Sequence, residues 1–574
     1  MQGAGVRSAA GLMDRKPIVR KASAVHELTA AGLWPALLDW GVAGALLLLT
    51  VAARVPFRSL MLYHWDSALF ALAFDHFDVT QHHPQPPGYF SYVFLAKLIN
   101  ILAGERNLSL VIESIAFSGL GVAALYLLGR HLFDRRTGLT AALLLFSSVS
   151  FWSYGEIAFP YVALAFFSAL LALIAASARL FGQPGIVGDR GRAYLAAAVF
   201  TMAGGFRQDL LLFLVPLWIL SLWGEPLRRV VLSLVIAALG FVVWFWPTIH
   251  LSGGWFQYQQ ALSAQSAAVA KEYGITGQGL VALVINVRDI LRYVFYALYA
   301  QVIILPVALI WPLGLGSTWI NTRRKGSVSD TAAARWTRML CPGFIESVRW
   351  DQRSRGRLAL LAVWMGPPLL FYSFVHVGDP GYVFSFMPAV HLLLASGLWS
   401  GVAVIQDRRL RLLALGRTGE RVSSLIRIRP KAFAGLVLAL LVAANVWIFL
   451  FHPRILTAPG IRQHDQDLRQ TIEYVRDNYP AGSAILLASD SYRHMQYYLP
   501  EYRSQWVDVH ATFDTAIPVG QGISAVILVD PSLAGLVHEN EGWNSPPAAS
   551  GRLYVRPLSA GQTLIFGQGV IVVR

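Results

Sequence analysis

The chain has 574 residues, of which 55% are hydrophobic and 14% charged, with a mean hydropathy of +0.51 and a net charge of +15. A soluble protein of this length carries about a quarter charged residues, so the composition excludes an ordinary soluble enzyme. The basic residues lie mostly in short loops between apolar segments, which indicates cytoplasmic loops of a membrane protein and no nucleic-acid partner. The single cysteine, Cys341, excludes an internal disulfide.

The first 32 residues are polar and basic and do not resemble a cleavable signal peptide, so we expect a cytoplasmic tail at 1–32. Eleven apolar segments follow, and each is expected to be helical because lipid offers the backbone no hydrogen-bond partner. They lie at approximately 33–53, 109–129, 138–153, 160–178, 193–205, 210–223, 230–247, 290–312, 358–376, 382–404 and 432–451. The segments at 193–205 and 210–223 are short for a full bilayer, which indicates a thinned membrane or a cavity beside them.

A further apolar helix at 87–103 decides the topology, because every later loop changes side if this helix crosses the membrane. If it does not cross, thirty of the 47 Lys and Arg residues fall on the cytoplasmic side, many of them in a loop at 313–357. The positive-inside rule favours that arrangement. We therefore predict an interfacial or re-entrant helix at 87–103, within a first outer loop at 55–108.

The residues after the last span, 453–574, predict a small extracytoplasmic α/β domain. The segment RQHDQDLRQTIEYVRDNYP is typical of a polar helix, GSAILLAS and ISAVILVD of buried strands, and QTLIFGQGVIVVR of a terminal hairpin. The fold class is thus a polytopic α-helical membrane protein with about 11 transmembrane helices in 33–452, interfacial helices in the first outer loop and this C-terminal domain. It is expected in the plasma (inner) membrane, in contact with its lipids.

The first outer loop carries most of the reactive side chains, and Asp66 stands there at the start of a short amphipathic helix. A carboxylate at this position can take a proton from a substrate hydroxyl at the bilayer surface, and it can equally cap the helix. Several histidines and aspartates of the loop could hold a divalent metal ion, but their spacing matches no strong metal motif. Solvated loop residues are the simpler interpretation, so the metal ligands stay unknown and no other cofactor is expected.

An aspartate just past the first span, followed by a His-Pro-Pro-type helix start, resembles the GT-C glycosyltransferases. More narrowly, the pattern is similar to the family 39-like protein O-mannosyltransferase branch, which includes the lipid A aminoarabinose transferases. The segment 126–167 resembles two spans of that family and the outer loop behind them, and HVGDPGYVFSFMPAVHLLLA resembles a late span of bacterial members. The resemblance covers 33–310 and 358–400.

In that family the aspartate of the first outer loop is the proposed general base, so the resemblance implies this role for Asp66. Many members have a second carboxylate directly after it, where this chain has Ser67. The family's His-Pro-Pro start appears here as His83-Pro84-Gln85-Pro86-Pro87, with one extra residue. Whether His82 or His83 corresponds is therefore open, and both are predicted to bind substrate.

The second outer loop carries Glu156 and Tyr161. The family often places an acidic or supportive residue there, and ionisable groups near a membrane interface are costly and tend to be functional. Glu156 is therefore predicted to be catalytic and Tyr161 to bind substrate. A solvated loop carboxylate is an equally good interpretation of Glu156.

Arg207 lies between the two short apolar segments, against the charge bias of the outer side. A guanidinium can hold a lipid phosphate through two parallel hydrogen bonds, so we predict that Arg207 binds substrate phosphate. The alternatives are an ion pair with Asp209 or snorkelling to the interface. His250 and Tyr382, at later outer helix ends, are weaker candidates for substrate binding.

Together these features predict an inverting glycosyltransferase that moves a sugar from a polyprenyl-phosphate carrier to an acceptor hydroxyl on the outer side of the membrane. Inversion is implied by the resemblance alone, and the acceptor is open between protein, lipid and glycan. One alternative is a transporter or flippase for lipid-linked glycans, which would need polar residues along a path through the bilayer. Another is a non-catalytic scaffold that binds polyprenyl lipid.

Overall fold

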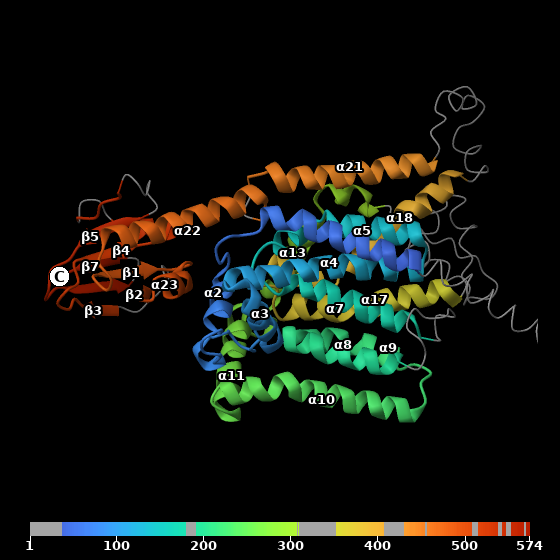
Figure 1. Ribbon diagram of the computed structural model, residues 1–574, viewed down its shortest axis with the longest axis horizontal. Helices are drawn as coiled ribbons and strands as arrows, with labels where there is room; N and C mark the ends of the chain where they lie inside the picture. The colour runs from blue at the N-terminus through green and yellow to red at the C-terminus, as the bar shows by residue number, and fades with distance from the viewer. Residues whose placement is uncertain are drawn as a thin grey trace, which may run out of the picture.

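The computed structural model describes residues 37–178, 191–306, 308, 352–406, 430–453, 456–507, 515–537, 542–546, 553–567 and 570–574. The tail predicted at 1–32 and most of the loop predicted at 313–357 lie outside these residues. The described part forms a bundle of helices that run side by side, with a smaller domain beyond one end of the bundle (Figure 1). We call this end, which carries the C-terminal domain, the domain end.

Five helices are long and apolar enough to cross a membrane: Leu37–Phe57, Arg106–Leu132 within α4, Leu227–Leu251 within α10, Gly356–Phe374 within α17 and Lys431–Phe451 within α21. The other bundle helices are shorter or less apolar: α5 Arg135–Phe146, α6 Val149–Tyr154, α7 Tyr161–Ala176, α8 Arg192–Phe206, α9 Asp209–Ser221, α13 Leu280–Leu298 and α18 Met387–Gln406. The full bounds of α10, α17 and α21 are Leu227–Leu251, Gln352–Phe374 and Pro430–Phe451. The protein is thus mostly helical with five candidate spans, and the count of eleven stays a prediction.

Two predicted spans differ from the helices observed. The segment at 138–153 is divided between α5 and α6, because Ser147 and Ser148 break the helix between them. The segment predicted at 290–312 starts inside α13, which covers Leu280–Leu298, and the 3-10 helix η4 follows at Tyr299–Ile304. Residues 307 and 309–312 of that segment lie outside the described part of the chain. Charged Arg288 and Asp289 lower the mean hydropathy of the first half of α13. The helix is nevertheless amphipathic, and one of its faces is buried.

The short helices α8 and α9 form a hairpin that stops below the first outer loop. Its turn carries Arg207 and Gln208, and Gln208 Nε2 donates a hydrogen bond to the Pro87 carbonyl over 2.9 Å. Gly205 lies so close to Ser91 that a Cβ at this position would collide with the Ser91 hydroxyl. Helices of this length are only about 20 Å long. The α8–α9 turn therefore ends below the first outer loop, with space between the turn and the loop.

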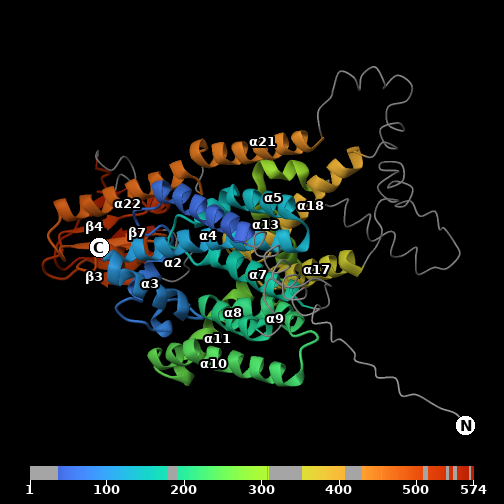
Figure 2. The ribbon, with the colours of Figure 1, turned by 45° about the vertical axis from the view of Figure 1, so that its right-hand side comes forward.

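Residues between the spans cover the domain end of the bundle (Figures 1 and 2). They form α2 Trp65–Leu72, η2 Val79–Gln81, α3 Phe90–Ala103, α11 Trp255–Glu272 and α12 Ile275–Gln278. Helix α3 starts beside Gly205, and just after its end Arg106 pairs with Asp75 at 2.7 Å. Both ends of this 14-residue helix thus contact residues at the domain end of the bundle, and its interfacial or re-entrant placement stays a prediction.

The C-terminal domain contains α22 Ala458–Asn478, α23 Tyr492–Tyr498, the 3-10 helix η6 Pro531–Leu536 and two sheets. The first sheet has the order β2-β1-β4-β5, with β1 parallel to both neighbours and β5 antiparallel to β4. The second is the antiparallel sheet β3-β6-β7. Their bounds are β1 Ala484–Ala488, β2 Arg503–Trp506, β3 Thr515–Pro518, β4 Ala525–Leu528, β5 Tyr554–Pro557, β6 Thr563–Gly567 and β7 Val570–Val573. The predicted helix, two buried strands and terminal hairpin are confirmed as α22, β1, β4 and β6–β7.

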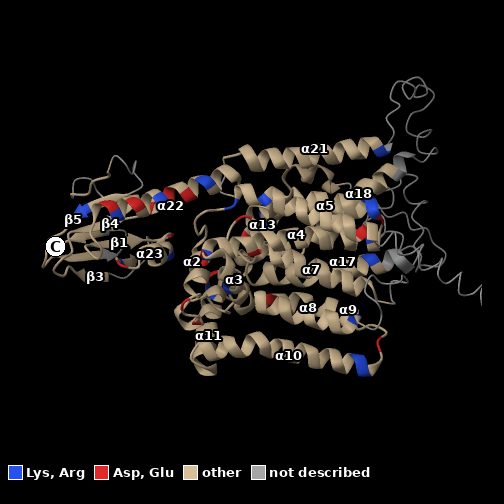
Figure 3. Cartoon of the chain, in the orientation of Figure 1, with Lys and Arg blue, Asp and Glu red and all other residues tan. Residues whose placement is uncertain are grey.

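The C-terminal domain rests on the chain just after the first span. The Asp465 carboxylate accepts hydrogen bonds from the Ser59 hydroxyl at 2.7 Å and the Leu60 amide at 2.6 Å, and the Leu62 amide donates to the Tyr498 hydroxyl at 2.9 Å. Figure 3 shows Lys and Arg gathered at the opposite end of the bundle. This charge distribution supports the predicted orientation, with the C-terminal domain outside the cytoplasm.

Candidate active site

Asp66 lies in the first turn of α2, where local hydrogen bonds hold it. His64 caps the helix: its Nδ1 accepts a hydrogen bond from the Asp66 amide at 3.1 Å. The Nε2 of His64 lies 3.4 Å from the Asp379 carboxylate, which arrives from the loop between α17 and α18. Since His64 makes the cap, the Asp66 carboxylate is not needed for it, and it has no hydrogen-bond partner among the described residues.

Ser67, which follows Asp66 in α2, is fully buried. Its hydroxyl accepts from the His64 amide at 3.1 Å and donates to the Ala158 carbonyl at 2.8 Å, which completes the helix cap. A carboxylate at position 67 would lie against the Ala158 carbonyl oxygen and, unlike the serine hydroxyl, would have no proton to donate to it. The serine is therefore part of the packing of α2 and does not face a ligand.

Asp66 opens onto a cavity of about 470 Å³ at the domain end of the bundle. The first outer loop, the α8–α9 turn, α11, α17 and the C-terminal domain all contribute to its wall. The lining residues are Trp65, Asp66, Leu69, His82, Gln85, Pro86, Pro87, Tyr89, Arg207, Asp209, Gln265, Val269, Phe371, Tyr372, Val375, His376, Tyr382 and Arg493. Asp66, His82, Arg207 and Tyr382, four of the predicted site residues, thus converge.

Arg207 is held on one side and open on the other. Its Nε donates to both carboxylate oxygens of Asp209, at 3.0 and 2.9 Å. Its guanidinium lies over the rings of Tyr382 and Tyr161, 3.9 and 4.8 Å from the centroids. The Nη1 atom is buried and has no hydrogen-bond partner among the described residues. The predicted ion pair with Asp209 is therefore present, and Nη1 is left for an anionic ligand.

Burial is the main cause of the shifted pKa values of the ionisable groups in the cavity. Burial raises the pKa of Asp66, while His64, Arg207 and His82 oppose that shift. Burial and the cation Arg207 lower the pKa of His376 to about 4, and burial and Arg493 lower that of His82. Both histidines are therefore neutral at pH 7, and the positive charge in the cavity comes from arginine.

The other predicted site residues lie apart from this lining. His83 pairs through its backbone with Asp78, and His250 is exposed at the end of α10. Tyr161 packs behind Tyr382, 5.3 Å between ring centroids. These three residues do not line the cavity, so His82 is the histidine that the structure brings to Asp66.

Glu156 is buried in a separate network near the end of the first span. Its carboxylate accepts a hydrogen bond from the Trp152 indole, and Arg54 lies over the same indole ring at 4.1 Å. Arg54 also donates to the Phe146 carbonyl at 2.7 Å. Because Glu156 is not among the residues that line the cavity, the structure favours a role in packing over the predicted catalytic one.

Arg493 is a charged residue of the cavity that the sequence did not indicate as a site residue. It comes from α23 of the C-terminal domain, and its guanidinium lies 5.5 Å from the Trp65 ring. Its Nε is buried without a hydrogen-bond partner in the described part of the chain. Nothing in the local sequence SYRHMQYY marks it, since its position depends on how the domain docks on the first outer loop.

Within the described residues, no group of three or more His, Cys, Asp or Glu side chains is placed to hold a metal ion. The potential ligands that line the cavity are Asp66, His82, Asp209 and His376; they do not form such a group, and Asp209 is already paired with Arg207. The described residues therefore provide no site for the divalent metal ion that the sequence left open.

Comparison with known proteins shows a similarity to one family over part of the chain. Residues 83–252 match the family described as dolichyl-phosphate-mannose-protein mannosyltransferase. This segment includes Arg207, His83, Glu156 and His250, but neither Asp66 nor the C-terminal domain. The match confirms the resemblance to GT-C glycosyltransferases that the sequence predicted. The match and the apolar helices together indicate an integral membrane protein. A search of curated proteins finds no match.

The solved structures that match this chain are distant in sequence. ArnT from Cupriavidus metallidurans bound to undecaprenyl phosphate has 13% identity and a TM-score of 0.48, over 91% of this chain and 97% of that one. Its apo state has 12% identity and a TM-score of 0.47, over 92% and 98%. The apo Archaeoglobus fulgidus oligosaccharyltransferase has 13% identity and a TM-score of 0.45, over 87% and 70%.

Proposed function

We propose that this protein is an inverting glycosyltransferase that moves a sugar from a polyprenyl-phosphate carrier to an acceptor hydroxyl on the outer side of the membrane. One observation carries the proposal: Asp66 and Arg207, from distant parts of the sequence, line the same cavity. A base and a cation in one cavity are what the reaction needs. The family that matches residues 83–252 is described as using a dolichyl-phosphate sugar, which supports this donor class.

The reaction assigns a role to each group. Asp66 takes the proton of the acceptor hydroxyl, whose oxygen forms a bond to the anomeric carbon. The bond from that carbon to the phosphate oxygen breaks, and its electron pair leaves on the polyprenyl phosphate. Arg207, through its unpartnered Nη1, and Arg493 stabilise the negative charge that develops on this leaving group. Attack on the face opposite the phosphate inverts the anomeric carbon.

The environment of Asp66 suits a general base. Burial raises its pKa toward the working pH, where a carboxylate is a more effective proton acceptor. The cavity lies at the domain end of the bundle, beside the short α8–α9 hairpin, so a lipid tail can stay in the membrane while its phosphate reaches Arg207. This arrangement supports an enzyme over a carrier, which would line a path through the whole bundle.

The test is sugar transfer from synthetic undecaprenyl-phosphate monosaccharides by purified protein with Asp66→Asn. We expect transfer and slow hydrolysis to fall by at least about 100-fold, the usual contribution of a general base. The matched control is Asp75→Asn, because Asp75 is in the same loop but pairs with Arg106 away from the cavity lining. A folded Asp66→Asn protein with normal turnover would exclude Asp66 as the base and favour the scaffold or carrier alternative.

A further inference from the structure

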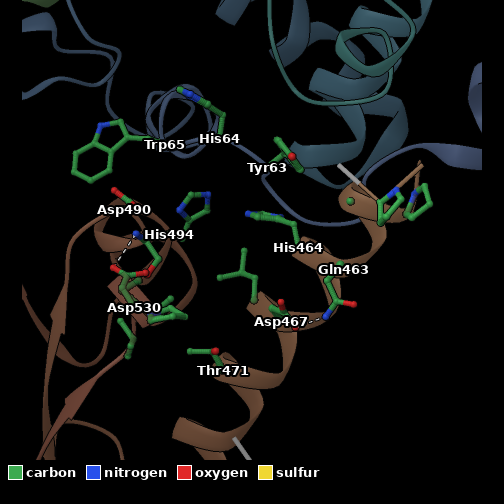
Figure 4. Close-up of a pocket in the computed structure, with 18 residues that line it drawn as sticks. Tyr63, His64, Trp65, Gln463, His464, Asp467, Thr471, Asp490, His494 and Asp530 are labelled. Carbon is green, nitrogen blue, oxygen red and sulfur yellow. Dashed lines mark hydrogen bonds between the residues drawn. The ribbon is translucent and has the colours of Figure 1, made fainter. Parts of the chain in front are cut away.

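A second cavity, of about 1010 Å³, lies between the first outer loop and the C-terminal domain. Figure 4 shows Tyr63, His64 and Trp65 on one side of it, and residues of α22 and α23 on the other. Trp65 lines both this cavity and the cavity of Asp66, which is its neighbour in the chain. A ligand in the second cavity therefore lies against the same turn of α2 that carries the candidate base.

The charge of this second cavity is opposite to that of the protein. Its lining includes Asp467, Asp490 and Asp530 but no lysine or arginine, although the chain has a net charge of +15. The cavity of Asp66 contains Arg207 and Arg493 instead. The two cavities thus divide the substrates by charge: the arginines suit the donor phosphate, and the carboxylates repel a phosphorylated or otherwise anionic ligand.

His494 is a buried polar side chain in the lining of the second cavity. Its side chain is only 3% exposed, and Figure 4 shows the ring between Asp490 and His464, turned toward the cavity. Neither ring nitrogen makes a hydrogen bond of acceptable geometry to a described residue, although the Leu62 backbone lies nearby. Burial lowers the pKa of His494 to about 3, so the ring is neutral, with one nitrogen that donates and one that accepts. Such a pair complements a hydroxyl, which also does both.

The remaining lining fits the same ligand. Trp65 and Tyr63 offer flat apolar rings with polar edges, which can stack on the apolar face of a pyranose. Asp490 and Asp467 lie across the cavity from them in Figure 4 and can accept hydrogen bonds from sugar hydroxyls. We infer that this cavity is the acceptor site and that it binds a neutral saccharide, whose hydroxyl reaches Asp66 past Trp65. The inference rests on the proposed function and names its acceptor class.

The experiment measures binding and not transfer, so that the acceptor site and the base are tested separately. The probes are fluorescent neutral tetrasaccharides of glucose, galactose and mannose, their 6-phosphates, and a Ser/Thr-rich peptide, titrated onto the full chain in detergent. A photoreactive form of any tetrasaccharide that binds is then cross-linked and located by mass spectrometry. We expect a neutral tetrasaccharide to bind, its 6-phosphate to bind at least about tenfold more weakly, and the label to fall within 459–471 or 490–495.

The variant is Asp490→Asn, and its matched control is Asp477→Asn, an exposed position on α22 outside the cavity lining. Asp490 is exposed, so its substitution should not disturb folding. Loss of a charged hydrogen-bond acceptor should weaken tetrasaccharide binding about tenfold. Binding of the peptide or the 6-phosphates in preference, a label elsewhere, or equal affinity of Asp490→Asn and Asp477→Asn would overturn the inference. None of these results depends on whether Asp66 is the base.

Discussion

The guanidinium of Arg207 lies 3.9 Å over the ring of Tyr382. This contact joins the α8–α9 turn to the 3-10 helix η5 at Pro380–Ser385, which precedes α18. The cation is held face-on by the ring and edge-on by Asp209, so its orientation is set before any ligand binds. A guanidinium that is held in advance loses little entropy when it binds a phosphate.

Substitution of Arg207 tests whether this orientation matters. Arg207→Lys keeps the charge but loses the planar fork and the stacking on Tyr382, so we expect kcat to fall by about 100-fold. The measurement is the rate of transfer from undecaprenyl-phosphate sugars at saturating donor. Arg288→Lys, at an exposed arginine of α13, is the control. Equal kcat values for the two variants would show that Arg207 acts only in packing.

The pH dependence of the reaction should reveal the raised pKa of Asp66. The base must be deprotonated, so activity is present above its pKa and lost as the pH falls through it. Because burial raises that pKa, kcat/KM should decline at a pH clearly above the value of about 4 that is usual for aspartate.

A second carboxyl nearby must be distinguished from Asp66 in this profile. Burial and the charge of Asp66, opposed by His64, raise the pKa of Asp379 to about 6. The profile should therefore be measured between pH 4 and 8 in wild type and in Asp379→Asn. An acid limb that persists in Asp379→Asn belongs to Asp66, and a limb at or below pH 4 in wild type would contradict a buried base.

Ser67 tests whether the chain has lost a functional carboxylate. The serine hydroxyl lies between the His64 amide and the Ala158 carbonyl, so Ser67→Ala should cost about 1 kcal/mol as the loss of a cap. Ser67→Glu places a buried carboxylate beside a carbonyl and should lower the Tm in detergent further. If Ser67→Glu has the wild-type Tm and higher activity, the position faces the substrate and the packing role is wrong.

Glu156 was predicted to be catalytic, and its surroundings favour a different outcome. Glu156 is buried and accepts a hydrogen bond from the Trp152 indole beside Arg54, so an amide in its place weakens that bond and adds a buried N–H group without a partner, at a cost of about 1–3 kcal/mol. Glu156→Gln should therefore lower the Tm while the folded fraction keeps its kcat. A 100-fold loss of kcat at unchanged Tm would restore the catalytic interpretation.

Much of the fold was predictable because its signals are local. Apolar length indicated the spans, and alternation or polar periodicity indicated α22, β1, β4 and the terminal hairpin. The start of α13 was missed because Arg288 and Asp289 lower the hydropathy of its first half, and mean hydropathy does not register an amphipathic helix. The break at Ser147 and Ser148 was missed because two serines interrupt the apolar segment without lowering its mean hydropathy much.

By itself the sequence determined that this is a membrane protein, that a short hairpin carries Arg207, and that Asp66 begins a helix beyond the first span. Each of these depends on residues close together in the chain. Only the tertiary structure decided that His82 and not His83 lines the cavity, that Glu156 is apart from it, and that Arg493 of the C-terminal domain reaches it. Convergence of this kind depends on how distant helices and a separate domain pack, and no local pattern encodes that.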